Sequence, residues 1–221
     1  MYKRQDQGFY LGDNPVPKAL KKVKLRKERT VKVRALSYEQ LATMLGKAKN
    51  ASTELYLGMA LGGYAGMRIG EVGNLRWEDI DLEQGLIRIQ PKQEAAGISA
   101  WEAKTNNSYR QIPISEELLE ILNNLQKDSG YVIEYQGRKI SRSSFRFDND
   151  KHWESVTGSF KDFTFHMLRH TFVSMLLNEG RSLEVVSKII GDTFHTCYNT
   201  YFTLQTSVHQ GISFKKSSAK E

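Results

Sequence analysis

The sequence predicts an α+β domain that is mainly helical, with a small antiparallel sheet of at most three strands set into it. Its 221 residues, 39% of them hydrophobic, are enough to bury one sizeable core. Several long stretches place apolar residues at helical spacing behind capping signals. Two stretches, LIRI at 86–89 and YRQIPI at 109–114, alternate as half-buried strands do.

The packed domain is expected to begin at Leu36, just before the first helix signal. Ser37 and Gln40 have the spacing of a capping box, so a helix is predicted to start there, and Ser115 is a second N-cap. The long connection between the two strands is expected to hold a short third strand at 101–104. Helical patterns cover residues 53–64, 68–75, 115–127, 142–148, 165–178, 182–190 and 195–204.

The segment between Pro15 and Arg34 carries many basic residues and a single acid, Glu28. One interpretation is a solvated tail; the other is a strap that lies along a phosphate backbone, and the charge pattern alone leaves both open. The candidate DNA-binding residues of this segment are Lys18, Lys21, Lys22, Lys24, Arg26 and Lys27.

The charge of the whole chain also favours a polyanionic partner, nucleic acid first. The formal net charge is +7 and the isoelectric point about 9.3. Cys197 is the single cysteine, so no internal disulfide forms, and the acidic residues are scattered rather than gathered as metal ligands. We therefore expect a cytoplasmic protein that needs neither metal nor cofactor and has no membrane segment.

The stretch HMLRHTF at 166–172 puts two histidines and an arginine within about one helical turn. An isolated His-x-x-Arg is more often part of a core or its boundary than a phosphate site. Three other stretches bear on the choice: GMRIGEVGNLRWEDID holds Arg68 and Glu71, AKTNNSYRQIP holds Lys104, and IIGDTFHTCYNTYF holds two tyrosines. Taken singly, Arg68 and Glu71 also fit a surface ion pair, Lys104 an ordinary exposed lysine, and the two tyrosines an aromatic core.

These four stretches, in this order and spacing, resemble the tyrosine recombinases, also called phage integrases. The resemblance runs from about Asn14 to Leu204 and implies the tyrosine-recombinase catalytic fold. LGDNPV and the basic run after it resemble the linker that precedes the catalytic domain in this family, whose upstream DNA-binding domains we expect this chain to lack. We therefore predict a basic interdomain linker at 1–35, a catalytic domain at 36–205 and a C-terminal tail at 206–221.

The resemblance also implies roles for individual residues. Arg68 and Arg169 match the two arginines that hold the non-bridging oxygens of the scissile phosphate, and Glu71 matches a supporting acid. Lys104 matches the lysine that protonates the leaving 5′ oxygen. His166 matches a histidine that serves as acid/base and phosphate ligand. Tyr201 matches the nucleophile, because its position 32 residues after Arg169 fits the family better than that of Tyr198.

One position departs from the family pattern. Asp192 follows Gly191 where the family usually has histidine and sometimes tryptophan. An ionised carboxylate cannot donate a hydrogen bond to a phosphate oxygen. Three possibilities stay open: His195 replaces the missing donor, Asp192 orients Arg68 or Arg169, or the site works less well.

The implied function is site-specific DNA recombination through a 3′-phosphotyrosine intermediate, without a metal ion. The expected partner is double-stranded DNA, bound by a homotetramer that is monomeric without DNA, with DNA-bending accessory proteins as possible partners, in a bacterial, phage or transposon context. The alternatives are a DNA-binding module that has lost catalysis, with Asp192 as the lesion, and a type IB topoisomerase-like strand transferase. The sequence leaves open whether Tyr201 serves its own subunit's site or a neighbour's.

Overall fold

Capping side chains set where the helices of the protein begin. In the computed structural model, which describes residues 34–93, 100–102, 109–135, 138–140, 150–160 and 162–209, the predicted capping box is confirmed. The Ser37 side chain accepts a hydrogen bond from the backbone N–H of Gln40, and the Gln40 side chain accepts one from the backbone of Ser37. Ser52, Ser115 and Ser182 cap three further helices through their side chains.

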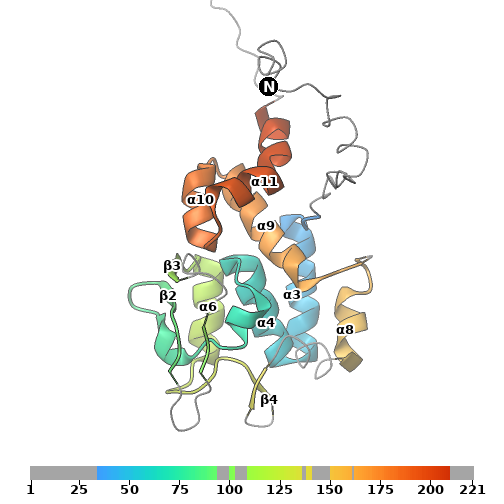
Figure 1. Ribbon diagram of the computed structural model, residues 1–221. Helices are drawn as coiled ribbons and strands as arrows, with labels where there is room; N and C mark the ends of the chain where they lie inside the picture. Colours follow the sequence, from blue (N-terminus) through green and yellow to red (C-terminus); the bar gives the residue numbers. More distant parts are fainter. Residues whose placement is uncertain are drawn as a thin grey trace, which may run out of the picture. The chain divides into compact units, whose positions relative to one another are not determined.

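The described elements are eight helices, one short 3₁₀ helix and five short strands (Figure 1). They are α3 (Tyr38–Ala51), α4 (Thr53–Ala65), α5 (Ile69–Val72), η1 (Trp77–Asp79), β1 (Ile80–Asp81), β2 (Leu86–Ile89), β3 (Arg110–Pro113), α6 (Glu116–Leu125), β4 (Glu134–Tyr135), β5 (Arg138–Lys139), α8 (Asp150–Thr157), α9 (Phe165–Asn178), α10 (Leu183–Ile190) and α11 (Phe194–His209). None of the described helices combines the length and the apolar character needed to cross a lipid bilayer.

The predicted sheet has three strands, but one of them is not the expected one. β1, β2 and β3 pair antiparallel in that order, with Ile87 opposite both Ile80 and Ile112. The third strand predicted at 101–104 is wrong as far as it is described, since Trp101 forms only an isolated bridge with Lys92. β1 escapes prediction because two residues are too short to show an alternating pattern.

Most helix predictions agree with the structure, and the exceptions lie at helix ends or beyond the described residues. α5 ends at Val72, so it is shorter than the expected 68–75, and α11 continues to His209, past the expected end at 204. The helix expected at 142–148 falls outside the described residues, whereas α8 at Asp150–Thr157 was not predicted. The predicted linker and tail also fall mostly outside those residues, so the domain boundaries remain predictions.

α4 is the central helix, with apolar residues on all sides and ten buried positions. α3 and α9 pack against it. A Cβ added at Gly62 would lie 3.0 Å from Leu168 Cδ1 of α9, so glycine lets the two helices approach closely. Together with the buried face of the sheet these helices form the main core, which includes Leu41, Leu55, Leu61, Ile87, Ile112, Leu122, Met167 and Leu168.

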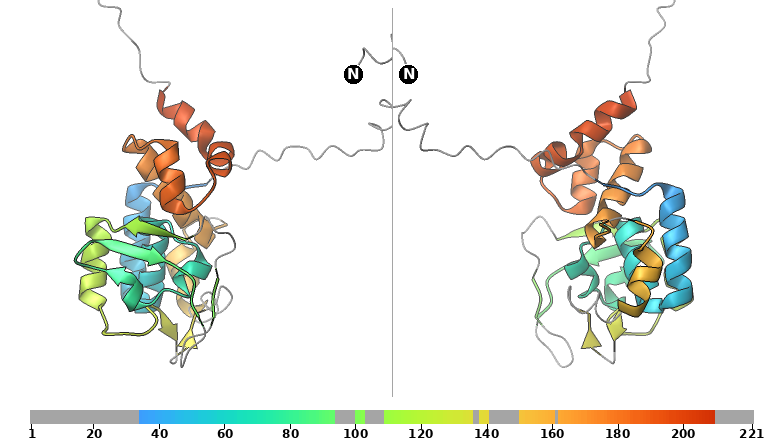
Figure 2. Two further views of the ribbon diagram at one scale, coloured as in Figure 1. Left: turned by 60° about the vertical axis from the view of Figure 1, so that its left-hand side comes forward. Right: turned by 90° about the vertical axis from the view of Figure 1, so that its right-hand side faces the viewer.

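A second, smaller core lies where α10 and α11 meet the later part of α9 (Figures 1 and 2). It consists of Phe172, Val173, Leu177, Leu183, Val186, Ile190, Cys197 and Tyr201. α9 therefore contributes Leu168 to the main core and Phe172 to the second core. The arginine and the histidine between them, Arg169 and His170, are thereby fixed at the junction of the two cores.

Candidate active site

Arg169 is the most deeply buried charged residue of the described chain, with 1% of its surface exposed. Its guanidinium donates to the backbone oxygen of Gly66, at the end of α4, over 2.7 Å, and to that of Ile190, at the end of α10, over 2.8 Å. It also pairs with Asp192 Oδ2 at 2.8 Å. A buried charge is tolerated only when it is paired and hydrogen-bonded, and these three acceptors hold Arg169 in one position.

Asp192 links Arg68 to the buried Arg169. Arg68 is the N-cap residue of α5, and it donates through Nη2 to Asp192 Oδ1 and to the backbone oxygen of Gly191. One carboxylate therefore bridges Arg68 and Arg169, which lie 101 positions apart in the sequence. Burial alone raises the pKa of Asp192, but the charges and hydrogen bonds of the two arginines hold that pKa below its ordinary value.

Glu71 also pairs with Arg68. Glu71 is itself held by Arg110, a residue that the sequence analysis did not single out. Its carboxylate accepts from Arg68 Nη1 at 2.8 Å and from both terminal nitrogens of Arg110 at 3.0 Å each. Burial opposes ionisation of Glu71, yet the hydrogen bonds and charge of Arg110, with those of Arg68, keep its pKa below the ordinary value. Glu71 therefore stays an anion between two guanidinium groups.

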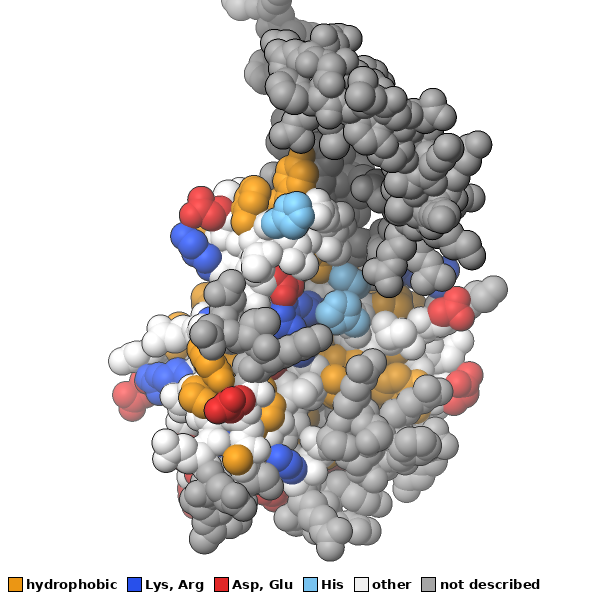
Figure 3. Space-filling model, in the orientation of Figure 1, with side chains coloured by type: hydrophobic (Ala, Val, Ile, Leu, Met, Phe, Trp, Pro, Cys, Tyr) orange, Lys and Arg blue, Asp and Glu red, His pale blue; other side chains and the backbone are white. Residues whose placement is uncertain are grey.

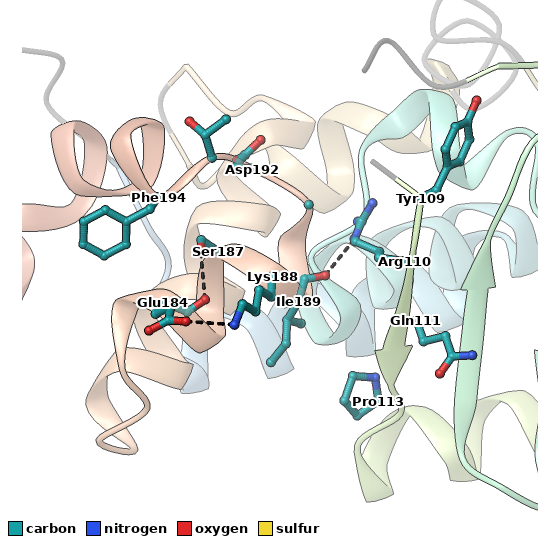
Figure 4. A pocket seen from close by; sticks show the side chains of 12 residues that line it. Tyr109, Arg110, Gln111, Pro113, Glu184, Ser187, Lys188, Ile189, Asp192 and Phe194 are labelled. Atoms are coloured by element: carbon teal, nitrogen blue, oxygen red, sulfur yellow. Dashed lines mark hydrogen bonds and ion pairs between the residues drawn. The ribbon is translucent and has the colours of Figure 1, made fainter. Parts of the chain in front are cut away.

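Arg110 also links the sheet to α10. Its Nε donates to the backbone oxygen of Ile189 over 2.7 Å. Both residues line a pocket of about 730 Å³ between β3 and the end of α10 (Figure 4). Gly191, Asp192 and Phe194 form part of the pocket wall. The strand that carries Arg110 thus fixes the loop that carries Asp192. In the sequence, an arginine inside the alternating stretch YRQIPI was the available signal.

Tyr201 meets a histidine of HMLRHTF, but not the one matched to the family histidine. The Tyr201 hydroxyl lies 2.6 Å from His170 Nδ1, and only 3% of Tyr201 is exposed. The His170 ring contacts the edge of the His166 ring, with 4.7 Å between the ring centres. His166 itself is exposed. In this structure the tyrosine therefore lies in the site of its own chain.

Burial shifts the pKa of both partners of this contact. It raises the pKa of Tyr201, so the phenol keeps its proton. It lowers the pKa of His170 to about 4, helped by the positive charges of His166 and Arg169 and opposed by Asp192. At neutral pH His170 is therefore an uncharged ring, and Nδ1 can accept the phenol proton as a hydrogen bond.

The remaining predicted site residues are either exposed or outside the described part of the chain. His195 is exposed, and its Nε2 lies 3.0 Å from the Asn199 side chain on the same helix, so its compensating role remains a prediction. Lys104 and the basic residues between Lys18 and Lys27 fall outside the described part of the chain. Basic, acidic and histidine side chains meet near the centre of the face shown in Figure 3.

A mainly helical domain with two arginines, a buried tyrosine and a histidine at one junction agrees with the resemblance drawn from the four stretches. The model of the Phage integrase family matches residues 20–207. The chain therefore belongs to the phage integrase family, and the resemblance to tyrosine recombinases is confirmed.

Curated relatives of the chain include tyrosine recombinases and a transposase from a transposon. Tyrosine recombinase XerC of Thermodesulfovibrio yellowstonii is 30% identical over 128 residues, which are 58% of this chain and 42% of that protein. Transposase A from transposon Tn554 of Staphylococcus aureus is 27% identical over 219 residues, which cover 91% of this chain and 57% of the relative. The chain thus spans about half the length of these relatives.

Solved structures confirm the predicted fold. The Tn1549 transposon integrase in complex with transposon right end DNA superposes with a TM-score of 0.64 at 19% identity, covering 94% of this chain and 73% of that one. The catalytic domain of bacteriophage HP1 integrase gives a TM-score of 0.55 at 18% identity, covering 85% of this chain and 98% of that domain. At these identities the likeness concerns the fold.

Proposed function

We propose that this chain is a site-specific DNA recombinase that cleaves and rejoins DNA through a 3′-phosphotyrosine intermediate. The observation that carries the proposal is the convergence of Arg68 and Arg169, from different parts of the chain, beside a buried tyrosine of the same subunit. Membership of the phage integrase family supports it. In this scheme guanidinium groups, rather than a metal ion, neutralise the charge of the reacting phosphate.

The chemistry follows from the types of the converging side chains. The Tyr201 oxygen attacks phosphorus, a 3′-phosphotyrosine bond forms, and the bond to the 5′ oxygen breaks. Arg68 and Arg169 stabilise the charge that develops on the non-bridging oxygens, and both are already fixed by their carboxylate and carbonyl partners. Lys104 is proposed to protonate the leaving oxygen, and His166 to contact the phosphate. Attack by the 5′ hydroxyl reverses the sequence and reseals the strand.

Asp192 affects how a DNA phosphate would bind at this site, because it already pairs with both Arg68 and Arg169. In the free protein its carboxylate pairs with both arginines. Counted with the pair of Glu71 and Arg110, the cluster holds three guanidinium groups and two carboxylates, so one net positive charge remains. We propose that a DNA phosphate takes over contacts that Asp192 now makes. The same contacts favour a second candidate, a DNA-binding module without catalysis, in which Asp192 is never displaced.

The proposed assembly is a homotetramer on two DNA duplexes, formed from monomers, with accessory DNA-bending proteins in the same complex. Solved relatives support the DNA part of this proposal. Two of them are the Tn1549 integrase in complex with transposon right end DNA and the XerH recombinase bound to a palindromic difH substrate. A mobile element, such as a phage or a transposon, is the setting in which such an activity would act.

A nicked suicide duplex tests the proposal, because loss of the cleaved fragment traps the covalent intermediate. The wild-type protein is expected to form a covalent protein–DNA adduct. Tyr201→Phe removes the nucleophilic oxygen and should form none. Tyr198→Phe is the matched control on the same helix, since Tyr198 is exposed, and its adduct yield should equal that of the wild type.

Three outcomes separate the candidates. An adduct that depends on Tyr201, together with strand exchange between matched sites, supports the recombinase. Supercoil relaxation without exchange indicates a topoisomerase-like strand transferase. Binding to duplex DNA without any adduct indicates the DNA-binding module.

A further inference from the structure

His170 is the side chain in contact with the atom that reacts in the proposed function. Its Nδ1 lies 2.6 Å from the Tyr201 hydroxyl oxygen, a distance typical of a strong O–H···N hydrogen bond. The two rings meet edge to face with 5.4 Å between their centres. His170 is four positions after His166 on the same helix face, and the structure selects the later of the two histidines as the neighbour of the tyrosine.

The packing of α11 explains this selection. Tyr201 and Cys197 are buried in the second core, against Phe172, Val173 and Leu177 of the later part of α9. That packing brings the tyrosine beside the end of the site that carries His170, whereas His166 lies nearer the start of α9 and is exposed. The contact is therefore fixed by the second core and not by a flexible surface side chain.

We infer that His170 is a catalytic residue that accepts the proton of the Tyr201 hydroxyl as this oxygen attacks the phosphate. The inference rests on the proposed function. In the step, the Oη–H bond breaks and its proton passes to Nδ1, the new Oη–P bond forms, and the bond from phosphorus to the 5′ oxygen breaks. The departing 5′ oxygen takes a proton from a separate acid, for which Lys104 is proposed. Religation returns the proton from Nδ1 to the tyrosine.

The charged groups around His170 influence how readily its ring accepts a proton. His166 and Arg169 face the ring from α9, Asp192 faces it from the loop before α11, and Tyr201 faces it from α11 itself. In the free protein burial, with Arg169 acting in the same direction, keeps the His170 ring uncharged, and burial keeps Tyr201 protonated, so no proton is transferred. Asp192 raises the pKa of His170, and a phosphate anion held by Arg68 and Arg169 acts in the same direction.

Two substitutions separate proton transfer from positioning. His170→Asn places an amide oxygen near the position of Nδ1, so it can accept the hydrogen bond of Tyr201 but cannot take the proton. His170→Gln is the second variant, should the asparagine variant not fold. His152→Asn on α8 is the matched control. Each variant is assayed as the full chain with the suicide duplex, in single turnover and over a range of pH.

A second substrate locates the step at which His170 acts. In a suicide duplex with sulfur in place of the bridging 5′ oxygen, the leaving thiolate needs no proton. The variants at His170 should form the adduct on the order of a hundredfold to ten-thousandfold more slowly than the wild type with both duplexes, the usual range for loss of a general base. His152→Asn should react at the wild-type rate.

Each outcome has a defined meaning. Variants at His170 that match the wild type overturn the inference, and so does a defect that disappears with the sulfur-containing duplex, because His170 would then act at the leaving group. A wild-type rate that falls at low pH, in an acidic limb that both His170 variants lose, supports the inference, because protonation of His170 removes the base; a limb that the variants keep overturns it. If the wild type itself forms no adduct with either duplex, it is the proposed function that fails.

Discussion

At the scale of single residues, Asp192 shows how one carboxylate can set the charge of a phosphate site. A histidine or tryptophan, which the resemblance leads us to expect there, donates a hydrogen bond, whereas Asp192 only accepts. It accepts from two arginines at once, one of them fully buried. The departure from the family pattern therefore places an anion between Arg68 and Arg169, the proposed phosphate ligands, and holds both guanidinium groups in place.

Asp192→Asn should strengthen the binding of a non-cleavable duplex. The substitution removes one negative charge from the site, so about one more phosphate is neutralised, and the slope of log affinity against log salt should become steeper by about 0.9. Fluorescence anisotropy at several salt concentrations measures it. Asp81→Asn, which alters a carboxylate paired with Arg88 on the sheet, is the control and should leave the slope unchanged. An unchanged slope for Asp192→Asn would contradict the assigned role.

His170 should make the free energy of unfolding depend on pH. Its pKa is about 4 in the folded protein, against an ordinary 6.5, so the unfolded chain binds more protons between these values. The contribution of His170 to the free energy of unfolding is therefore full above the ordinary pKa and falls as the pH drops toward 4, by at most ~3.5 kcal/mol at ~1.4 kcal/mol per pKa unit. Denaturant unfolding of wild type and His170→Asn at several pH values checks this, since the variant should lose less stability over this range.

At the scale of elements, the ends of α4 and α10 make the site. Gly66 ends α4 and Gly191 ends α10, both in the left-handed conformation with φ of 60° and 69°. The backbone oxygens at these two ends, those of Gly66 and Ile190, are the carbonyl partners of Arg169. Helix termination therefore supplies acceptors that the helices themselves leave unused.

Gly66→Ala should destabilise the protein more than the same change at another left-handed glycine. A Cβ at Gly66 would lie 2.4 Å from Phe172 Cδ1, whereas a Cβ at Gly180, with φ of 82°, meets open space. Gly180→Ala should lower the free energy of unfolding by about 1–2 kcal/mol, because of backbone strain alone. Gly66→Ala should lower it by a further ~1–3 kcal/mol, because the added Cβ overpacks against Phe172. Urea unfolding compares them; equal losses would mean that Phe172 moves aside freely.

At the scale of the whole molecule, α9 ties two cores together and carries the site at their junction. Leu168 packs in the main core, and Phe172 packs in the second core with Tyr201. The arginines depend on contacts to α4, α5 and α10, while the tyrosine depends on the second core alone. The packing of the second core thus decides whether Tyr201, the proposed nucleophile, meets the rest of the site.

The basic segment before the domain should contribute to DNA affinity without affecting the site. If Lys21 and Lys22 each neutralise a phosphate, the double alanine variant should lower the salt slope of binding by about 1.8. Lys47→Ala with Lys49→Ala, on α3, is the control of equal charge change and should leave the slope near the wild-type value. Equal slopes for both double variants would favour the solvated-tail interpretation.

Much of the fold followed from local signals, and the failures have local causes as well. The capping box at Ser37 and the helical pattern at 165–178 were confirmed because short-range hydrogen bonds and apolar periodicity determine them. The strand at Ile80–Asp81 was missed because two residues are too few to show an alternating pattern. It is defined by its pairing with Ile87 and Leu86 of the next strand. Of the predicted site, Arg68, Arg169, Glu71 and Asp192 lie together, and their catalytic roles remain proposals.

The sequence by itself determined the family, the helical character of the domain and which types of side chain the site contains. These features depend on the order of motifs and on apolar periodicity, which can be recognised in the sequence without the fold. Tertiary structure alone decided the pairing of these side chains. Asp192 meets Arg68 across 124 positions, Arg110 meets Glu71 across 39, and Tyr201 meets His170 across 31. Such contacts depend on how α10, α11 and β3 pack around α9 and α5, and packing is a property of the whole molecule that no local pattern specifies.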